Sequence, residues 1–258
     1  MTADQRIREK VAEFYGHHWQ NPEHTPILDG KITHLLAIFG DTIRGQRVLD
    51  AGSGSGMTSV AFARLGAAEV VGVDISRSCV DQANALAKQL GGDNIEFHQG
   101  DLTEALPVTG KFDIVYSFGV VQFTPACEQA FKNIGSYVDE GGRLAVALYP
   151  KTSLSPLWQG LRHLYRTLPG PAKAVWDYAA LASVKLHDLA SPSGRGRGQS
   201  TELEQIRDWF GVPHKTFVRR DQALSWLKDL GMDGEIAVPY TGRFTSTSQF
   251  IVLGRKDG

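Results

Sequence analysis

The chain has 258 residues, which is enough for one sizeable α/β domain with an inserted subdomain. A hydrophobic fraction of 42%, a charged fraction of 21% and a formal net charge of -1 give no basic field for nucleic acid or for a membrane surface. No apolar run reaches the ~18 residues of a membrane span, and the polar N-terminal segment lacks a signal peptide's apolar core. Cys79 and Cys127, the two cysteines, indicate neither a disulfide framework nor a thiolate metal site. These features predict a cytoplasmic protein.

The predicted elements begin with helical stretches at roughly residues 4–15 and 31–40. From Arg47 to about Leu148, short apolar runs typical of strands then alternate with helical runs. The strand runs are RVLDAG, EVVGVD, NIEFHQGD, KFDIVYSFG and GGRLAVALYP, and the helical runs are MTSVAFARLG, RSCVDQANALAKQLGG and PACEQAFKNIGSYV. Nearly continuous apolar strands separated by helices predict a parallel sheet covered on both faces and doubly wound by right-handed crossovers.

The last part of the chain divides into a helical region and a β-hairpin. Residues 155–210 have a helical pattern and many aromatic side chains, interrupted by the loop-forming run SPSGRGRGQS. The remainder is predicted as a helix followed by two strands. Because no helix joins these two strands, they form a hairpin, and the last strand is expected to be antiparallel to its neighbours.

Three glycines, Gly52, Gly54 and Gly56, lie between the first strand and the helix that follows it. A turn without side chains lets the backbone approach a ligand, and the helix N-terminus behind it presents free N–H groups. Dinucleotide-binding turns space their glycines as G-x-G-x-x-G, whereas the spacing here is G-x-G-x-G with Asp50 two residues ahead. A carboxylate there suits an ammonium or sulfonium group better than a pyrophosphate.

Four segments in this order, VLDAGSGSG, VVGVDIS, HQGDL and FDIVYSFGVVQFTP, resemble the signature segments of class I S-adenosylmethionine (SAM)-dependent methyltransferases of the small-molecule type. The resemblance covers roughly residues 46–150. It implies an α/β, doubly wound, Rossmann-like sheet of seven strands with a reversed last strand and a helical insertion after the fifth strand. The expected divisions are an N-terminal helical lid (1–45), a SAM-binding core (46–150), an insertion that caps the acceptor (151–215) and a C-terminal helix and hairpin (216–258).

The resemblance also implies which residues bind the cofactor. Asp74 ends the second strand, where an acid accepts both ribose hydroxyls, and Asp101 would accept the adenine amine. The full predicted set is Asp50, Gly52, Gly54, Gly56, Asp74, Ile75, Asp101, Leu102, Ser117 and Val120. Each of Asp74 and Asp101 is alternatively a helix cap, and Asp50 is alternatively structural.

The acceptor is less legible than the cofactor. Gln122 and Phe123 replace a histidine pair found in related fourth segments, so Gln122 is predicted as a catalytic amide and Phe123 as a wall of the acceptor pocket. Near the N-terminus, Tyr15 and His18 are further catalytic candidates and Trp19 a substrate contact, as is Tyr149 after the fifth strand. His17, His163 and His187 are weaker candidates for a base, and no metal is expected.

The leading hypothesis is transfer of a methyl group from SAM to an O, N or C atom of a small molecule by in-line displacement. The alternative keeps the SAM site but cyclises or cleaves the SAM side chain, releasing methylthioadenosine. A NAD-dependent oxidoreductase and a catalytically idle SAM-binding protein also stay open. The expected partners are a small-molecule acceptor and a second copy of the chain in a homodimer, without nucleic acid or membrane.

Overall fold

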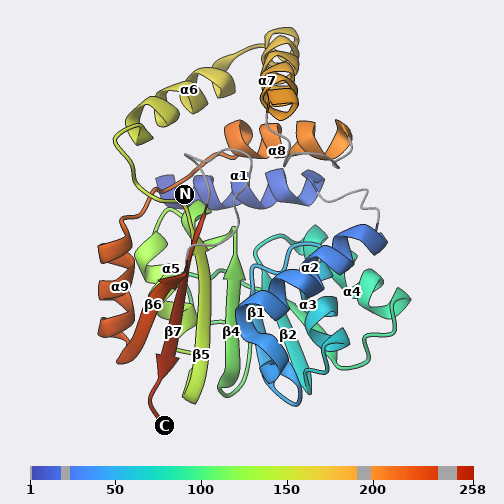
Figure 1. Cartoon of the computed structure of the whole chain (residues 1–258), viewed down its shortest axis with the longest axis vertical. Coiled ribbons are helices and arrows are strands. Elements are labelled where there is room, and N and C mark those ends of the chain that lie inside the picture. The colour runs from blue at the N-terminus through green and yellow to red at the C-terminus, as the bar shows by residue number, and fades with distance from the viewer. Residues whose placement is uncertain (1, 19–23, 191–198, 238–248) are drawn as a thin grey trace.

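The computed structural model describes residues 2–18, 24–190, 199–237 and 249–258. Its strands form one seven-stranded sheet in the order β3-β2-β1-β4-β5-β7-β6 (Figure 1). In chain order these strands are β1 (Arg47–Ala51), β2 (Glu69–Asp74), β3 (Ile95–Gln99), β4 (Phe112–Phe118), β5 (Val138–Leu148), β6 (Met232–Ala237) and β7 (Phe250–Lys256).

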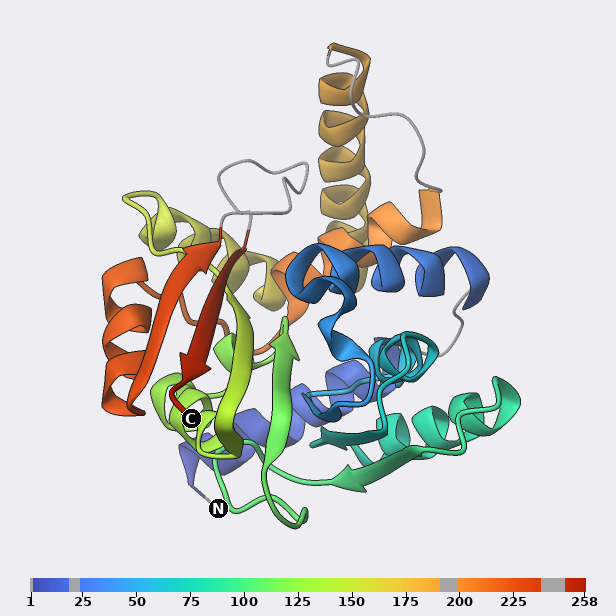
Figure 2. The same cartoon turned by 60° about the horizontal axis from the view of Figure 1, so that its bottom comes forward.

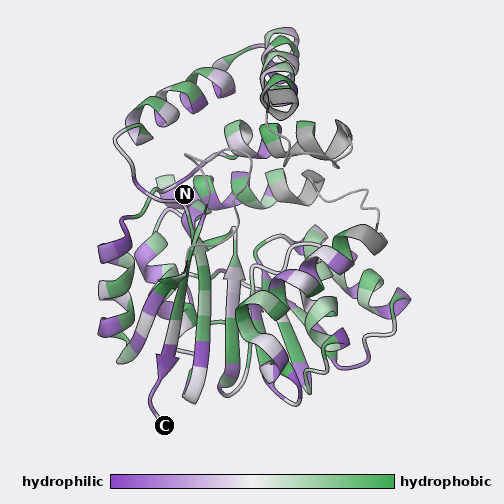
Figure 3. Ribbon diagram, viewed as in Figure 1, coloured by the Kyte–Doolittle hydropathy of each residue, from purple (hydrophilic) through white to green (hydrophobic). Residues whose placement is uncertain are grey.

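The pairing pattern confirms the predicted fold class. The first five strands are parallel; Leu49 of β1, for example, pairs with Val71 of β2 on one side and Val115 of β4 on the other. Strand β7 runs antiparallel to both β5 and β6. Central parallel strands are buried on both faces, which explains why most of their residues are apolar (Figure 3).

Helices cover both faces of this sheet. On one face α5 (Cys127–Gly135) and α9 (Arg220–Asp229) bury side chains such as Phe131 and Trp226, whose ring centroids lie 5.3 Å apart. On the other, α2 (His24–Phe39) and α3 (Met57–Arg64) pack Phe39 and Phe62 against β1 and β4. The amphipathic α4 (Arg77–Gln89) covers β3, and the Ser76 hydroxyl caps it by accepting the Cys79 N–H.

One predicted boundary is wrong. The helical run after the fourth strand was expected to continue through the residues SYV, but α5 ends at Gly135 and β5 already begins at Val138. Val138 pairs with Phe112, and a register shift between Phe112 and Ile114 separates this first pair from the rest of the ladder. Sheet pairing therefore overrides the local helical pattern.

The remaining helices lie at the carboxyl edge of the parallel strands. Helix α1 (Ala3–His18) crosses this edge, and α6 (Ser155–Thr167), α7 (Gly170–Ala190) and α8 (Gln199–Gly211) lie above it (Figure 1). Figure 2 shows α7 projecting away from the sheet. These three helices are the predicted insertion after the fifth strand. Residues 191–198, which hold most of the SPSGRGRGQS run, lie outside the described residues.

The aromatic side chains of this insertion serve two different purposes. Tyr165, Trp176 and Phe210 pack against one another with ring centroids 5.4–5.9 Å apart and form a small core of the insertion itself. Trp209 instead faces the sheet domain, where its ring contacts Tyr149 at a centroid distance of 5.0 Å. Tyr178, by contrast, is exposed.

Candidate active site

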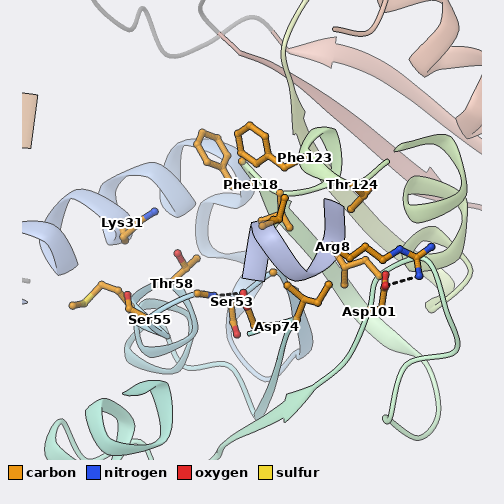
Figure 4. A pocket seen from close by; sticks show the side chains of 18 of the residues that line it. Arg8, Lys31, Ser53, Ser55, Thr58, Asp74, Asp101, Phe118, Phe123 and Thr124 are labelled. Carbon is orange, nitrogen blue, oxygen red and sulfur yellow. Dashed lines mark hydrogen bonds and ion pairs between the residues drawn. The ribbon is translucent and has the colours of Figure 1, made fainter. Parts of the chain in front are cut away.

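A cavity of about 1080 Å³ lies where β1, β2 and β4 end and where α1 crosses the sheet edge (Figure 4). Helices α1 and α2, the turn between β1 and α3, and the segments after β2, β3 and β4 all contribute to it. Its lining residues are Arg8, Val11, Ile27, Lys31, Gly52, Ser53, Gly54, Ser55, Met57, Thr58, Asp74, Ile75, Asp101, Leu102, Phe118, Gly119, Val120, Phe123, Thr124 and Pro125. Seven of the ten residues predicted to bind the cofactor are among them.

The glycine turn forms one wall of this cavity. Gly52 has a φ of 90°, and its N–H donates to the carbonyl of Val73 at 2.7 Å. A Cβ added to Gly52 would lie 2.3 Å from Cγ2 of Val120, so no other residue fits without displacing that side chain. Glycine at position 52 therefore allows the turn to approach Val120 closely.

Gly56, also predicted to bind the cofactor, makes a close packing contact in the structure. It precedes α3 with a φ of 80° and does not line the cavity. A Cβ at this position would lie 2.8 Å from Cβ of Ala83 and 2.8 Å from Cζ of Phe97. The third glycine thus lets α3 and α4 pack closely, which positions the start of α3.

Asp74, predicted to bind the ribose, also holds the glycine turn. Its Oδ2 accepts the Gly54 N–H and its Oδ1 accepts the Ser76 N–H, each at 2.9 Å. Burial raises the pKa of this carboxyl group, while the backbone hydrogen bonds act in the opposite direction. Asp74 therefore connects the turn after β1 to the end of β2 and leaves part of its carboxylate at the cavity wall.

Asp101 lies at the opposite end of the cavity and pairs with α1. Its Oδ1 accepts the N–H and the hydroxyl of Thr103, at 2.8 and 2.7 Å, and its Oδ2 lies 2.9 Å from a guanidinium nitrogen of Arg8 (Figure 4). The same nitrogen contacts Glu104 at 3.1 Å. No helix follows Asp101, so the alternative prediction of a helix cap is wrong, and its bonds to Thr103 close a turn instead. Asp101 lines the cavity, and Arg8 anchors α1 over it.

Lys31 and Asp50 place opposite charges beside the glycine turn. Lys31 of α2 extends into the cavity (Figure 4), while Asp50 is buried behind the turn and does not line it. Burial raises the pKa of Asp50 to about 6 despite a 2.6 Å hydrogen bond donated by the Ser59 hydroxyl. Burial also lowers the pKa of Lys31, and the charge of Asp50 opposes that shift.

The residues predicted around the acceptor do not all reach the cavity. Phe123 lines it, but Gln122 is completely buried elsewhere, and among the described residues neither atom of its amide has a hydrogen-bond partner. Tyr149 packs behind Phe123, with ring centroids 6.2 Å apart. Ser117, predicted to bind the cofactor, also lies outside the lining, and its hydroxyl donates to the carbonyl of Ala51 at 2.7 Å.

The N-terminal candidates fall largely outside what the structure describes. Trp19 lies outside the described residues, and so do the side chains of Tyr15, His17 and His18, whose backbone belongs to α1. The side chain of His187 is likewise not described, and His163 is exposed. Their predicted roles stay predictions.

Several lining residues have no counterpart among the predicted site residues. Arg8 and Lys31 come from helices far from the glycine turn in sequence, and no motif marked them. Ser53, Ser55 and Thr58 lie within or just after the turn, where their proximity to the glycines was a usable signal. Buried Ser53 Oγ has no partner among the described residues, as expected of a group that meets a ligand.

Two structural findings concern what the described part of the chain lacks. None of its helices combines the length and the apolar character that a membrane span requires. Within the same residues, no three His, Cys, Asp or Glu side chains come together in the manner of a metal site.

The chain is similar to several known enzymes. It is 31% identical over 140 residues to the ubiquinone biosynthesis O-methyltransferase of Coxiella burnetii, covering 54% of this chain and 58% of that enzyme. Over 131 residues it is 35% identical to the magnesium-protoporphyrin O-methyltransferase of Rhodobacter capsulatus, covering 48% and 54%. The chain thus spans little more than half the length of these curated relatives.

The fold has solved counterparts as well. The magnesium protoporphyrin IX methyltransferase of Synechocystis PCC 6803, crystallised with bound SAM, superimposes with a TM-score of 0.60 at 16% identity, covering 100% of this chain and 98% of that one. A family described as a methyltransferase domain matches residues 43–205, which include the glycine turn, both acids that line the cavity and most of the helical insertion. The chain belongs to this methyltransferase domain family.

Proposed function

We propose that the chain transfers a methyl group from SAM to a small-molecule acceptor by direct in-line displacement. Membership of the methyltransferase domain family supports this, and so does the bound SAM in the Synechocystis enzyme of the same fold. The observation that carries the proposal is the cavity over the glycine turn. Asp74, Asp101 and Lys31 line different parts of this one cavity.

The residues present fit this cofactor. The turn at Gly52 is closed to any side chain, so it offers bare backbone to the methionine part. Lys31 lines the cavity and matches the carboxylate of the methionine part, while Asp50 lies behind the turn and does not line the cavity. Asp74 and Asp101 supply the two carboxylates that ribose hydroxyls and the adenine amine require, and Ile75 and Leu102 add apolar contacts beside them.

The protein's own contribution is binding, alignment and exclusion of water. SAM supplies an activated methyl group on a sulfonium, so displacement needs no metal and little covalent assistance from the protein. Arg8 and Val11 bring α1 over the cavity, so the helix both contacts the site and shields it from solvent. We assign to residues 1–45 the role of a lid on this basis.

The acceptor end of the cavity is formed by the segment after β4. Phe118, Phe123 and Pro125 give it an apolar wall, and Thr124 adds a hydroxyl, which suits a small aromatic or apolar acceptor. The O-methyltransferases among the relatives favour an oxygen nucleophile. We further propose that the helical insertion caps the acceptor. The protein is proposed to form a homodimer, to have no nucleic-acid partner and to be cytoplasmic.

Product analysis tests the proposal against its alternative. The purified protein is incubated with SAM and a panel of small phenols, amines and carboxylic acids. Methyl transfer predicts acceptor-dependent formation of S-adenosylhomocysteine. Acceptor-independent release of methylthioadenosine would instead establish cleavage or cyclisation of the SAM side chain, and binding of NADH but not SAM would contradict both.

Lys31 gives a separate test of the cofactor orientation. Replacing it with methionine keeps the length of the side chain and removes the charge. We expect Lys31→Met to weaken binding of S-adenosylhomocysteine by roughly 1.5–3 kcal/mol, the range for a hydrogen bond to a charged group. Lys88→Met, at an exposed position of α4, serves as the control. Equal calorimetric affinities for the two variants would show that Lys31 does not contact the cofactor.

A further inference from the structure

Lys215 is a buried amine to which the proposed methyl transfer assigns no role so far. Its side chain is only 3% exposed. It lies in the segment between α8 and α9, whose Val218 forms a β-bridge with Pro150 beyond the end of β5. The side-chain amide of Gln159 in α6 donates to the Lys215 carbonyl at 2.6 Å, and the next residue, Thr216, donates its N–H to the carbonyl of Gln122 at 2.8 Å. The insertion and the sheet domain thus hold Lys215 from both sides.

Three aromatic rings surround the ε-amino group. Nζ lies 3.7 Å from the ring centroid of Trp209, 4.4 Å from that of Tyr149 and 5.2 Å from that of Phe123. Its hydrogen-bond partner is the carbonyl of Trp209, at 3.4 Å. No carboxylate of the described residues forms a salt bridge with it. A buried amine without a paired acid is costly, so the position calls for a functional explanation.

Burial, and not the balance of nearby charges, favours a neutral amine at Lys215. Burial lowers the pKa of Lys215 well below its usual value, and the positive charge of Arg162 in α6 adds to that shift. Asp208 in α8 opposes it. Tyr149 remains protonated, since burial raises the pKa of its hydroxyl. A neutral amine in an aromatic enclosure is able to accept a proton at physiological pH.

Phe123 connects this enclosure to the cofactor cavity. Its ring lines the cavity and also contacts the Lys215 amine, so this single side chain belongs to both. The other acceptor-side residues of the cavity, Phe118, Thr124 and Pro125, offer no basic group. Lys31 also lines the cavity, with its Nζ 5.9 Å from the Phe118 ring centroid, but it is the amine assigned to the cofactor. Lys215 is therefore the remaining amine for an acceptor that enters past Phe123.

We propose that Lys215 is the base of the acceptor site and removes the proton from a hydroxyl group on an aromatic acceptor that packs among Phe123, Tyr149 and Trp209. The O–H bond breaks as an N–H bond forms, giving an ammonium and an aryloxide. The aryloxide oxygen bonds to the methyl carbon as the carbon–sulfur bond breaks, and the released proton stays on Lys215 until it passes to solvent. This role rests on the proposed methyl transfer and requires the Phe123 ring to turn aside when the acceptor binds.

The test uses 4-nitrophenol, whose phenolate is coloured and whose neutral form is not, added to the protein loaded with S-adenosylhomocysteine. At a pH about one unit below the probe's own pKa, we expect the wild-type protein to bind the probe as phenolate. Lys215→Met, which keeps the side-chain length without a basic nitrogen, is expected to lower the bound phenolate at least tenfold. Lys151→Met, at an exposed lysine in the neighbouring segment, is expected to behave as wild type.

The outcomes separate this inference from the proposed function. A wild-type protein that binds S-adenosylhomocysteine by calorimetry but gives no phenolate, or gives as much as Lys215→Met, overturns the role of Lys215 and leaves methyl transfer intact. Failure of the wild type to bind S-adenosylhomocysteine overturns both.

The stability of Lys215→Met is measured separately, as the pH dependence of its free energy of unfolding. A lysine that is neutral when folded and protonated when unfolded makes stability rise with pH, because the unfolded state binds more protons. We expect Lys215→Met to be at least as stable as wild type and to lose this part of the pH dependence in denaturant titrations. A variant that is less stable at every pH would show that the amine is structural.

Discussion

Replacing Asp74 with alanine is expected to weaken binding of S-adenosylhomocysteine by about 2–4 kcal/mol, which corresponds to roughly 30- to 1000-fold in affinity. Two effects contribute. The variant loses the carboxylate that we assign to the ribose hydroxyls, and it also loses the acceptor for the N–H groups of Gly54 and Ser76. The turn that carries the methionine part is therefore released together with the ribose contact.

Calorimetry on three variants separates these effects. Asp74→Asn keeps one oxygen acceptor at the same place and is expected to bind more tightly than Asp74→Ala but less tightly than wild type. Asp81→Ala removes an exposed acid of α4 that pairs with Arg77, and it is expected to leave affinity unchanged. An Asp74→Ala protein that is folded by circular dichroism and keeps wild-type affinity would remove Asp74 from the cofactor site.

The fold was predictable because its signals are local and repeated. The central strands are mostly apolar, as in EVVGVD, and helix α4 has a recognisable start at Ser76. The reversal of β7 followed from the absence of a helix between the last two strands. The end of α5 was less predictable, because its last residues satisfy a helical pattern until pairing with Phe112 takes Val138 into the sheet.

The site was predictable on the cofactor side and much less so on the acceptor side. Residues that bind the cofactor lie at the ends of successive strands, so the order of strands places Gly52, Asp74 and Asp101 around one cavity. Arg8 meets Asp101 only through tertiary packing across 93 positions of sequence. Lys215 carries no sequence signature at all, because its surroundings come from α8, the end of β5 and the segment after β4.

The same distinction applies to the three glycines, which look equivalent in sequence. Gly54 donates its N–H to Asp74, Gly56 makes room for α4, and Gly52 makes room for Val120. The spacing of the glycines alone identifies the turn. Which neighbour a side chain at each position would meet depends on elements that are distant in sequence.

Gly52→Ala is expected to lower the free energy of unfolding by about 2–5 kcal/mol. Alanine at a φ of 90° costs ~1–2 kcal/mol, and forcing a Cβ to within 2.3 Å of Val120 adds about 1–3 kcal/mol of overpacking. Gly141→Ala is the matched control, because Gly141 has a φ of 75° but nothing within 4 Å of an added Cβ, so it incurs only the backbone cost. The double variant Gly52→Ala/Val120→Ala relieves the overpacking but keeps the backbone cost. In denaturant titrations its free energy of unfolding should therefore return only to the level of Gly141→Ala. If Gly52→Ala is no less stable than Gly141→Ala, the close approach of the turn to Val120 does not determine the identity of residue 52.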